Sequence, residues 1–110
     1  MTETELSECI LSMPGSWLDY PFGEGTAVYK YGSRDDKDKM FAIIAEGEKP
    51  VKISLKCDPQ LAEILREKYE TVLPGYHLSK KHWNTILCTG QVPLGELHDL
   101  IRHSYELVKN

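Results

Sequence analysis

The sequence predicts an α+β domain in which helices pack on one side of an antiparallel sheet. Three observations lead to this prediction. Segments of strand character follow one another closely, as in an antiparallel meander. Segments of helical periodicity are confined to the two ends of the chain and one central stretch. The chain has 110 residues, enough for one buried core, so we expect residues 1–110 to form a single domain.

The N-terminal part begins with a segment of helical spacing. Apolar side chains recur every three or four positions over residues 4–13, and the Pro-Gly-Ser sequence at 14–16 ends the predicted helix. Residues 17–23 are rich in aromatic side chains and are interrupted by proline and glycine. We predict that they form a loop whose rings plug the core at the sheet edge.

Three strands are predicted next. Residues 26–31 and 41–45 are rich in β-branched and aromatic side chains, and a polar, charged turn over residues 32–39 separates them. Residues 51–56 alternate regularly, so Val51, Ile53 and Leu55 should point inward and their lysine and serine neighbours outward.

The C-terminal half adds two helices and two strands. Asp58-Pro59 combines a capping side chain with proline at the first helical position, and apolar spacing extends this helix to Val72. An extended segment at 76–78, a tight connection at 79–82, a strand at 83–89 and a helix at 94–108 follow. The predicted order is α-β-β-β-α-β-β-α, a two-layer sandwich.

Composition limits the classes of function. The hydrophobic content of 41% and the charged content of 27% are typical of a globular protein, and no apolar run is long enough to cross a bilayer. We expect neither a membrane span nor a signal peptide. Three widely spaced cysteines without a Cys-x-x-Cys pair indicate free thiols in a reducing compartment, so we expect a cytoplasmic location.

Charge is unevenly distributed along the chain. The formal net charge of −4 argues against a protein that coats nucleic acid indiscriminately. Residues 1–25 nevertheless contain five carboxylates and no lysine or arginine, whereas residues 76–90 contain two lysines and no carboxylate. The sequence therefore predicts an acidic end and a basic strip.

The basic strip, residues 74–85, is the candidate binding site. Lysines supply affinity for phosphates, and aromatic rings can stack on bases. For Trp83 two interpretations stay open, an exposed ring that binds a ligand and a ring folded into the core. The candidate nucleic-acid or ligand-binding residues are Arg66, Tyr76, His77, Lys80, Lys81, His82, Trp83 and Asn84.

The sequence offers little support for metal binding or catalysis. His77 and His82 lack the close ligand spacing and further ligands that a zinc site requires, so we expect no metal and no other cofactor. Neither a nucleophile elbow nor a glycine-rich phosphate loop is present. Cys57 next to Lys56 is the one candidate nucleophile, and without a recognised catalytic motif we predict that the protein is not an enzyme.

Several sequence motifs, distributed from about Leu11 to Val108, resemble the MmcQ/YjbR family. They are Pro21-Phe22-Gly23, Lys39-Met40-Phe41-Ala42, Leu55-Lys56-Cys57-Asp58-Pro59, Leu65-Arg66-Glu67, Pro74-Gly75-Tyr76-His77-Leu78, Lys80-Lys81-His82-Trp83-Asn84-Thr85 and Ser104-Tyr105. The resemblance implies a CyaY-like fold similar to that of type III secretion chaperones. It also implies DNA binding through a "double wing" of strands and turns. The turn at 33–38 departs from the family pattern because it is longer and carries three aspartates, which would repel phosphate.

Two functions follow as hypotheses. The first is a non-enzymatic DNA-binding module that binds weakly and in a salt-dependent manner through the basic strip. The second is a protein- or small-ligand-interaction module with a chaperone-like fold and no affinity for nucleic acid. Burial of Trp83 would favour the first hypothesis, because the surface of the strip would then be mostly charge.

Overall fold

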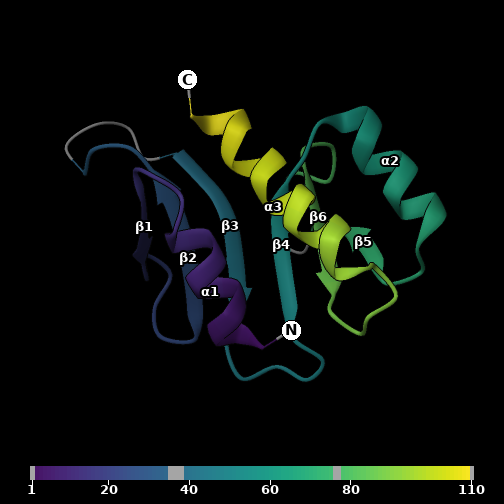
Figure 1. Cartoon of the computed structure of the whole chain (residues 1–110), viewed down its shortest axis with the longest axis horizontal. Coiled ribbons are helices and arrows are strands. Elements are labelled where there is room, and N and C mark those ends of the chain that lie inside the picture. Colours follow the sequence, from purple (N-terminus) through teal and green to yellow (C-terminus); the bar gives the residue numbers. More distant parts are fainter. Residues whose placement is uncertain (1, 35–38, 76–77, 110) are drawn as a thin grey trace.

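The computed structural model describes residues 2–34, 39–75 and 78–109 and has an α+β fold, as predicted (Figure 1). Its strands form an antiparallel sheet in the order β1-β2-β3-β4-β6-β5. The order along the chain contains one strand more than the sequence predicted. The elements are α1 (Glu3–Leu11), β1 (Ser16–Asp19), β2 (Thr26–Tyr31), β3 (Lys39–Ala45), β4 (Lys52–Lys56), α2 (Pro59–Lys68), β5 (Val72–Pro74), β6 (Trp83–Leu87) and α3 (Leu94–Val108).

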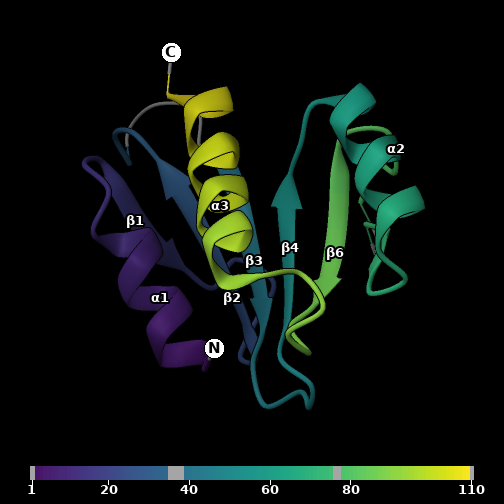
Figure 2. The same cartoon turned by 45° about the vertical axis from the view of Figure 1, so that its right-hand side comes forward.

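The core lies between one face of the sheet and the helices. Side chains of α1, α2 and α3 join a single buried cluster with those of the strands, so all three helices pack on the same face. Figure 2 shows α3 in front of the middle of the sheet, α1 beside it and α2 near β6. Fully buried side chains such as Leu6, Ile53 and Ile101 connect helices to strands within this cluster. The predicted placement of helices on one side is confirmed.

A bulge in β3 turns an aromatic ring into the core. Tyr29 pairs with Ala42 and Lys30 pairs with Met40, so Phe41 is the extra residue between them. The Phe41 ring is fully buried and meets Tyr105 of α3 edge to face, with ring centroids 5.7 Å apart. This contact fixes α3 against the centre of the sheet.

The prediction of a core-plugging loop at residues 17–23 is wrong. Ser16–Asp19 forms the edge strand β1, because its backbone pairs with β2. Trp17 points to the face of the sheet opposite the helices, where the Arg34 guanidinium lies 4.1 Å from its ring centroid. Phe22 follows the strand and is 67% exposed, so it plugs no core.

The predicted extension of the central helix to Val72 is also wrong. α2 ends at Lys68, and the next residue, Tyr69, has extended backbone angles. Val72 instead begins β5 and pairs with Ile86 of β6. Its apolar side chain reaches the same core from a strand, which is why helical spacing continued across the boundary.

The opposite face of the sheet carries no helix in the part of the chain that the structure describes. Polar side chains there pair across strands. Lys30, only 7% exposed, donates through its ammonium group to Asp19 over 2.9 Å, and the Ser54 and Thr85 hydroxyls are 2.8 Å apart. Over the described residues, no helix is both long and apolar enough to cross a membrane.

Candidate nucleic-acid interface

The candidate strip connects β5 to β6. Its first described residues are Pro74 and Gly75, and its last two, Trp83 and Asn84, begin β6. Tyr76 and His77 lie outside the described residues. The strip therefore divides into a turn around residues 78–82, which faces solvent, and a strand that belongs to the sheet.

Trp83 is part of the packed interior, with 6% of its surface exposed. It pairs with Lys56 of β4, and its carbonyl oxygen accepts a 2.9 Å hydrogen bond from the Gly75 amide. A Cβ atom at Gly75 would lie only 2.7 Å from the Trp83 Cβ. Of the two interpretations left open, the buried ring is confirmed.

Asn84 is buried too, with 2% of its surface exposed. Its side-chain amide donates to the Ala62 carbonyl oxygen over 3.2 Å, which ties β6 to α2. The other polar side-chain atom, Oδ1, has no hydrogen-bond partner among the described residues. Asn84 links strand and helix, and a base cannot reach it without disturbing the core.

Arg66 positions the turn. Its guanidinium Nη1 donates to the Lys80 carbonyl oxygen over 2.9 Å, across the gap between α2 and the strip. The turn is held on its other side by the Cys57 amide, which donates to the His82 carbonyl oxygen over 2.7 Å. The two contacts fix the backbone while the side chains of Lys80, Lys81 and His82 are exposed.

Two further lysines lie at the same end of the sheet. Lys39 at the start of β3 and Lys56 at the end of β4 line a shallow hollow of about 390 Å³ together with Trp83 and the end of α3. Figure 2 shows the start of β6, the end of β4 and the end of α3 at this upper end. We call Lys39, Lys56, Lys80 and Lys81 the basic end. Sequence reasoning did not group them, because only the pairing of β3, β4 and β6 brings them together.

The opposite end of the molecule carries several carboxylates, with Lys49 and Lys52 beside them. Glu3 begins α1, and Glu46 and Glu48 lie in the turn after β3, near the N-terminus at the bottom of Figure 2. Glu3, which belongs to the acidic N-terminal segment predicted from the sequence, therefore lies at the opposite end of the fold from the basic strip.

The described residues around the strip give little support for metal binding or for nucleophilic catalysis. Within the described ranges, no three histidine, cysteine or carboxylate side chains are grouped as a metal site. Burial raises the pKa of the Cys57 thiol to about 11, and the neighbouring Asp58 carboxylate adds to the shift. The thiol is therefore protonated at neutral pH and is not poised as a nucleophile.

These features define the class: a small α+β domain whose sheet carries helices on one face and exposed cations at one end. Comparison with known proteins agrees with this description. The YjbR family profile matches residues 11–107. The chain belongs to the YjbR family.

Individual relatives support the assignment. The chain is 38% identical over 74 residues to "Uncharacterized protein YjbR" of Escherichia coli K12, a match that covers 67% of this chain and 63% of that protein. It is 35% identical over 98 residues to "Uncharacterized protein YbdF" of Escherichia coli O157:H7, covering 89% of this chain and 76% of the relative. The match to the first relative thus spans less than two thirds of its length.

Solved structures agree with the fold. A Deinococcus radiodurans protein described by its DUF419 domain superposes with a TM-score of 0.93 at 38% identity, covering 97% of this chain and 78% of that one. A Pseudomonas syringae protein superposes with a TM-score of 0.81 at 29% identity, covering 99% and 100%. The descriptions of these proteins name no activity.

Proposed function

We propose that this protein is a non-enzymatic module that binds the phosphate backbone of DNA through the basic end. One observation carries the proposal: Trp83 and Asn84 are buried, while Lys80 and Lys81 are exposed on a turn with a fixed backbone. The surface of the strip is then dominated by charge, which suits phosphates and not bases. Of the residues expected to contact bases, His82 alone among the described ones is exposed.

The proposed binding is weak and independent of sequence. Lysines hold phosphates as point charges, and each phosphate neutralised on a duplex contributes roughly −0.9 to the slope of log affinity against log salt. Lys80 and Lys81 should together contribute about −2 to that slope. The net charge of −4 opposes approach to DNA, so we expect micromolar or weaker affinity at low salt.

An NMR titration of the ¹⁵N-labelled protein with a short random-sequence duplex tests the proposal. Shifts at residues 78–82 and at Lys39 and Lys56 should develop at low salt and fade as salt rises. The variant with Lys80→Glu and Lys81→Glu should lose these shifts.

The control variant reverses the charge of two lysines at the other end of the sheet, Lys49→Glu and Lys52→Glu. It changes the net charge by the same amount as the Lys80→Glu and Lys81→Glu variant. Among the residues that the structure describes, Lys52 pairs with Glu48 alone, and this ion pair is exposed, so the control should fold normally. Equal loss of binding in both double variants would mean that net charge, not the basic end, governs binding. No shifts in the wild-type protein would remove DNA binding altogether.

The second candidate is an interaction module for a protein or a small ligand. The observation that favours it is a hollow of about 530 Å³ beside α1, separate from the basic end. Its chemistry allows a more definite inference.

A further inference from the structure

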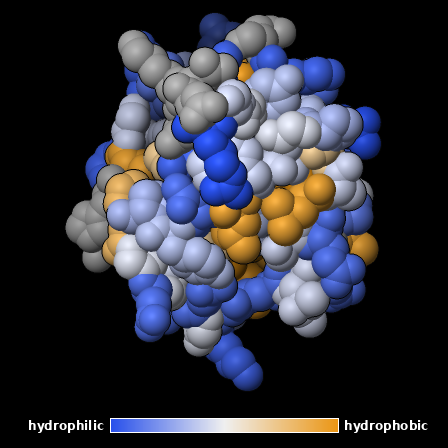
Figure 3. Space-filling model, turned by 90° about the vertical axis from the view of Figure 1, so that its left-hand side faces the viewer, coloured by the Kyte–Doolittle hydropathy of each residue, from blue (hydrophilic) through white to orange (hydrophobic). Residues whose placement is uncertain are grey.

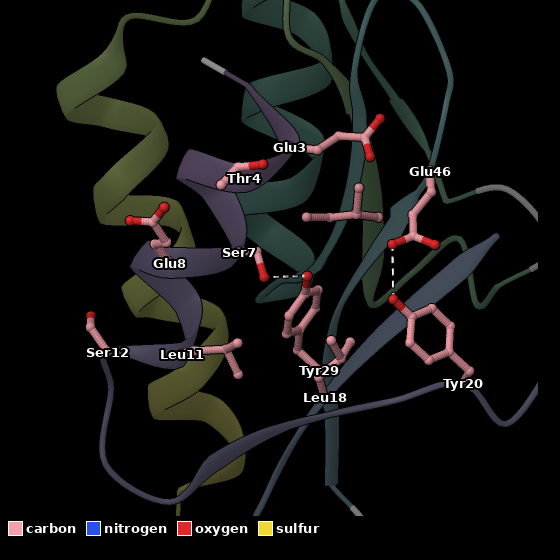
Figure 4. Close-up of a pocket in the computed structure, with 11 residues that line it drawn as sticks. Glu3, Thr4, Ser7, Glu8, Leu11, Ser12, Leu18, Tyr20, Tyr29 and Glu46 are labelled. Carbon is pink, nitrogen blue, oxygen red and sulfur yellow. Dashed lines mark hydrogen bonds between the residues drawn. The ribbon is translucent and has the colours of Figure 1, made fainter. Parts of the chain in front are cut away.

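A hollow lies between α1 and the edge of the sheet, and we call it the α1–β1 hollow. Its volume of about 530 Å³ falls within the roughly 300–1,000 Å³ typical of small-molecule sites. Figure 4 shows side chains of α1 on one side and those of the strands on the other. None of the residues of the basic end lines it.

The floor of the hollow is apolar. Leu11 of α1, Leu18 of β1 and Ile44 of β3 line it from three different elements. Leu11 is 40% exposed although it faces the hollow, so apolar surface there is open to solvent. From the side on which β1 lies, the surface likewise has a small apolar area enclosed by hydrophilic residues (Figure 3). A short hydrocarbon chain would be desolvated on such a floor.

The rim of the hollow is negatively charged. Glu3, Glu8 and Glu46 line it, and no lysine, arginine or histidine does. In the described part of the chain, none of these three carboxylates forms an ion pair. Figure 4 shows Glu8 and Glu46 on opposite sides of Ser7 and Tyr29, so negative charge flanks both sides of the hollow.

The rim also presents mainly hydrogen-bond acceptors. The Tyr20 hydroxyl donates to Glu46 Oε2 and the Tyr29 hydroxyl donates to Ser7 Oγ, each over 2.9 Å. Both tyrosine protons are therefore engaged, while their oxygens and the carboxylates can still accept. A ligand that fits this rim must bring donors, and a primary ammonium group brings three together with a positive charge.

The pKa values of Tyr20 and Tyr29 reflect the negative charge around the hollow. Burial raises the pKa of Tyr29, and the charges of Glu46 and Glu3 raise it further. The hydrogen bond to Glu46 raises the pKa of Tyr20. Carboxylates from α1 and from the turn after β3 thus act on the same interior point, where a cation would be stabilised.

We propose that the α1–β1 hollow binds a small aliphatic molecule with protonated primary amines at both ends. One ammonium group lies at Glu46 and Tyr20, the other at Glu8, and the carbon chain lies on Leu11 and Leu18. The proposal is independent of DNA binding, because it uses none of the lysines of the basic end.

The test is an NMR titration of the ¹⁵N-labelled protein with 1,4-diaminobutane at constant ionic strength. Shifts should appear at α1, at residues 18–20 and at residues 44–46. The uncharged 1,4-butanediol, of similar length, should produce none, and n-butylamine should bind more weakly because it has one ammonium group. Equal binding of the diol, or no shifts with millimolar diamine, would overturn the proposal.

Two variants distinguish binding in the hollow from general attraction of a cation to a negatively charged protein. Glu46→Gln keeps an acceptor for Tyr20 but removes the charge, and it should weaken diamine binding about tenfold or more. Glu24→Gln makes the same change in net charge at an exposed residue outside the hollow and should leave binding unchanged. Equal weakening by both variants would reduce the effect to attraction by net charge and refute the site.

Two further results bear on the proposal. The variant with Lys80→Glu and Lys81→Glu should bind diamine as the wild type does, so failure of DNA binding leaves this test intact. A capped lysine amide presents the same ammonium group on a peptide. If it binds more tightly than the diamine, the hollow takes a lysine side chain of a partner protein, and the small-molecule proposal is wrong.

Discussion

Replacing Gly75 by alanine should destabilise the protein. The backbone at Gly75 does not require glycine, since its φ angle is not in the left-handed region, so the effect is one of space. The added Cβ would lie 2.7 Å from the Trp83 Cβ and 3.2 Å from both the Leu78 Cβ and the Trp83 carbonyl oxygen. The first distance is about 0.8 Å shorter than an ordinary carbon–carbon contact of about 3.5 Å.

The neighbours of Gly75 cannot easily give way. The Trp83 Cβ is the root of a buried side chain, and its own backbone is paired with β4. Relief therefore requires movement of the strip relative to β6. Overpacking of this kind costs about 1–3 kcal/mol. For a chain of this size that loss corresponds to a fall in Tm of roughly 4 °C or more.

Gly95 provides the matched control. It lies in the first turn of α3, where an added Cβ would meet nothing within 4 Å. Gly95→Ala should stabilise the protein by about 0.5–1 kcal/mol, because alanine is the better helix former. Urea unfolding followed by tryptophan fluorescence measures both variants. A Gly75→Ala free energy of unfolding within about 0.5 kcal/mol of the wild-type value would refute the close packing of Gly75 on Trp83.

Three further predictions concern buried and paired side chains. Asn84→Asp should lower the free energy of unfolding at neutral pH by about 3 kcal/mol or more, because it buries a carboxylate without a cationic partner. That loss should shrink as the pH falls and the new carboxyl group is protonated, which chemical denaturation across pH would detect. The hydrogen bond from Lys30 lowers the pKa of Asp19, so its stabilisation is present at neutral pH and is lost as pH falls through the folded-state pKa. Asp19→Asn should therefore lie below the wild type in stability at pH 6 and converge with it as the pH falls through the lowered folded-state pKa of Asp19. With Trp17→Phe, the remaining emission from Trp83 should be shielded from iodide, and strong quenching would contradict its burial.

Local patterns predicted the fold best where a residue's role depends on its immediate neighbours. Asp58 was identified as a helix cap, and its carboxylate accepts the amides of Gln60 and Leu61 over 3.1 and 3.2 Å. The alternation in the third predicted strand places Ile53 and Leu55 in the core as expected. Capping and alternation act over a few residues, so a single sequence is sufficient to predict them.

Prediction failed where distant pairing decides the structure. Ser16–Asp19 has no run of β-branched residues, and it is a strand because β2 offers it a partner. Asn84 looked like a polar binding residue, yet its amide is directed at Ala62 across a helix–strand contact that no local pattern contains. Of the basic end, only Lys80 and Lys81 are adjacent in sequence. Lys39 and Lys56 join them through the sheet.

The separation of charge along the molecule affects how copies of the protein behave toward one another. Along the axis that joins the two ends, vertical in Figure 2, the molecule extends 29 Å, about three times the screening length of about 10 Å at 0.1 M salt. At moderate salt the acidic and basic ends therefore act as independent patches. At about 0.01 M salt the screening length grows to about 30 Å, and the ends behave as the poles of one electric dipole. Copies should then attract one another head to tail in spite of their shared net charge of −4, so added salt should raise the solubility of the protein.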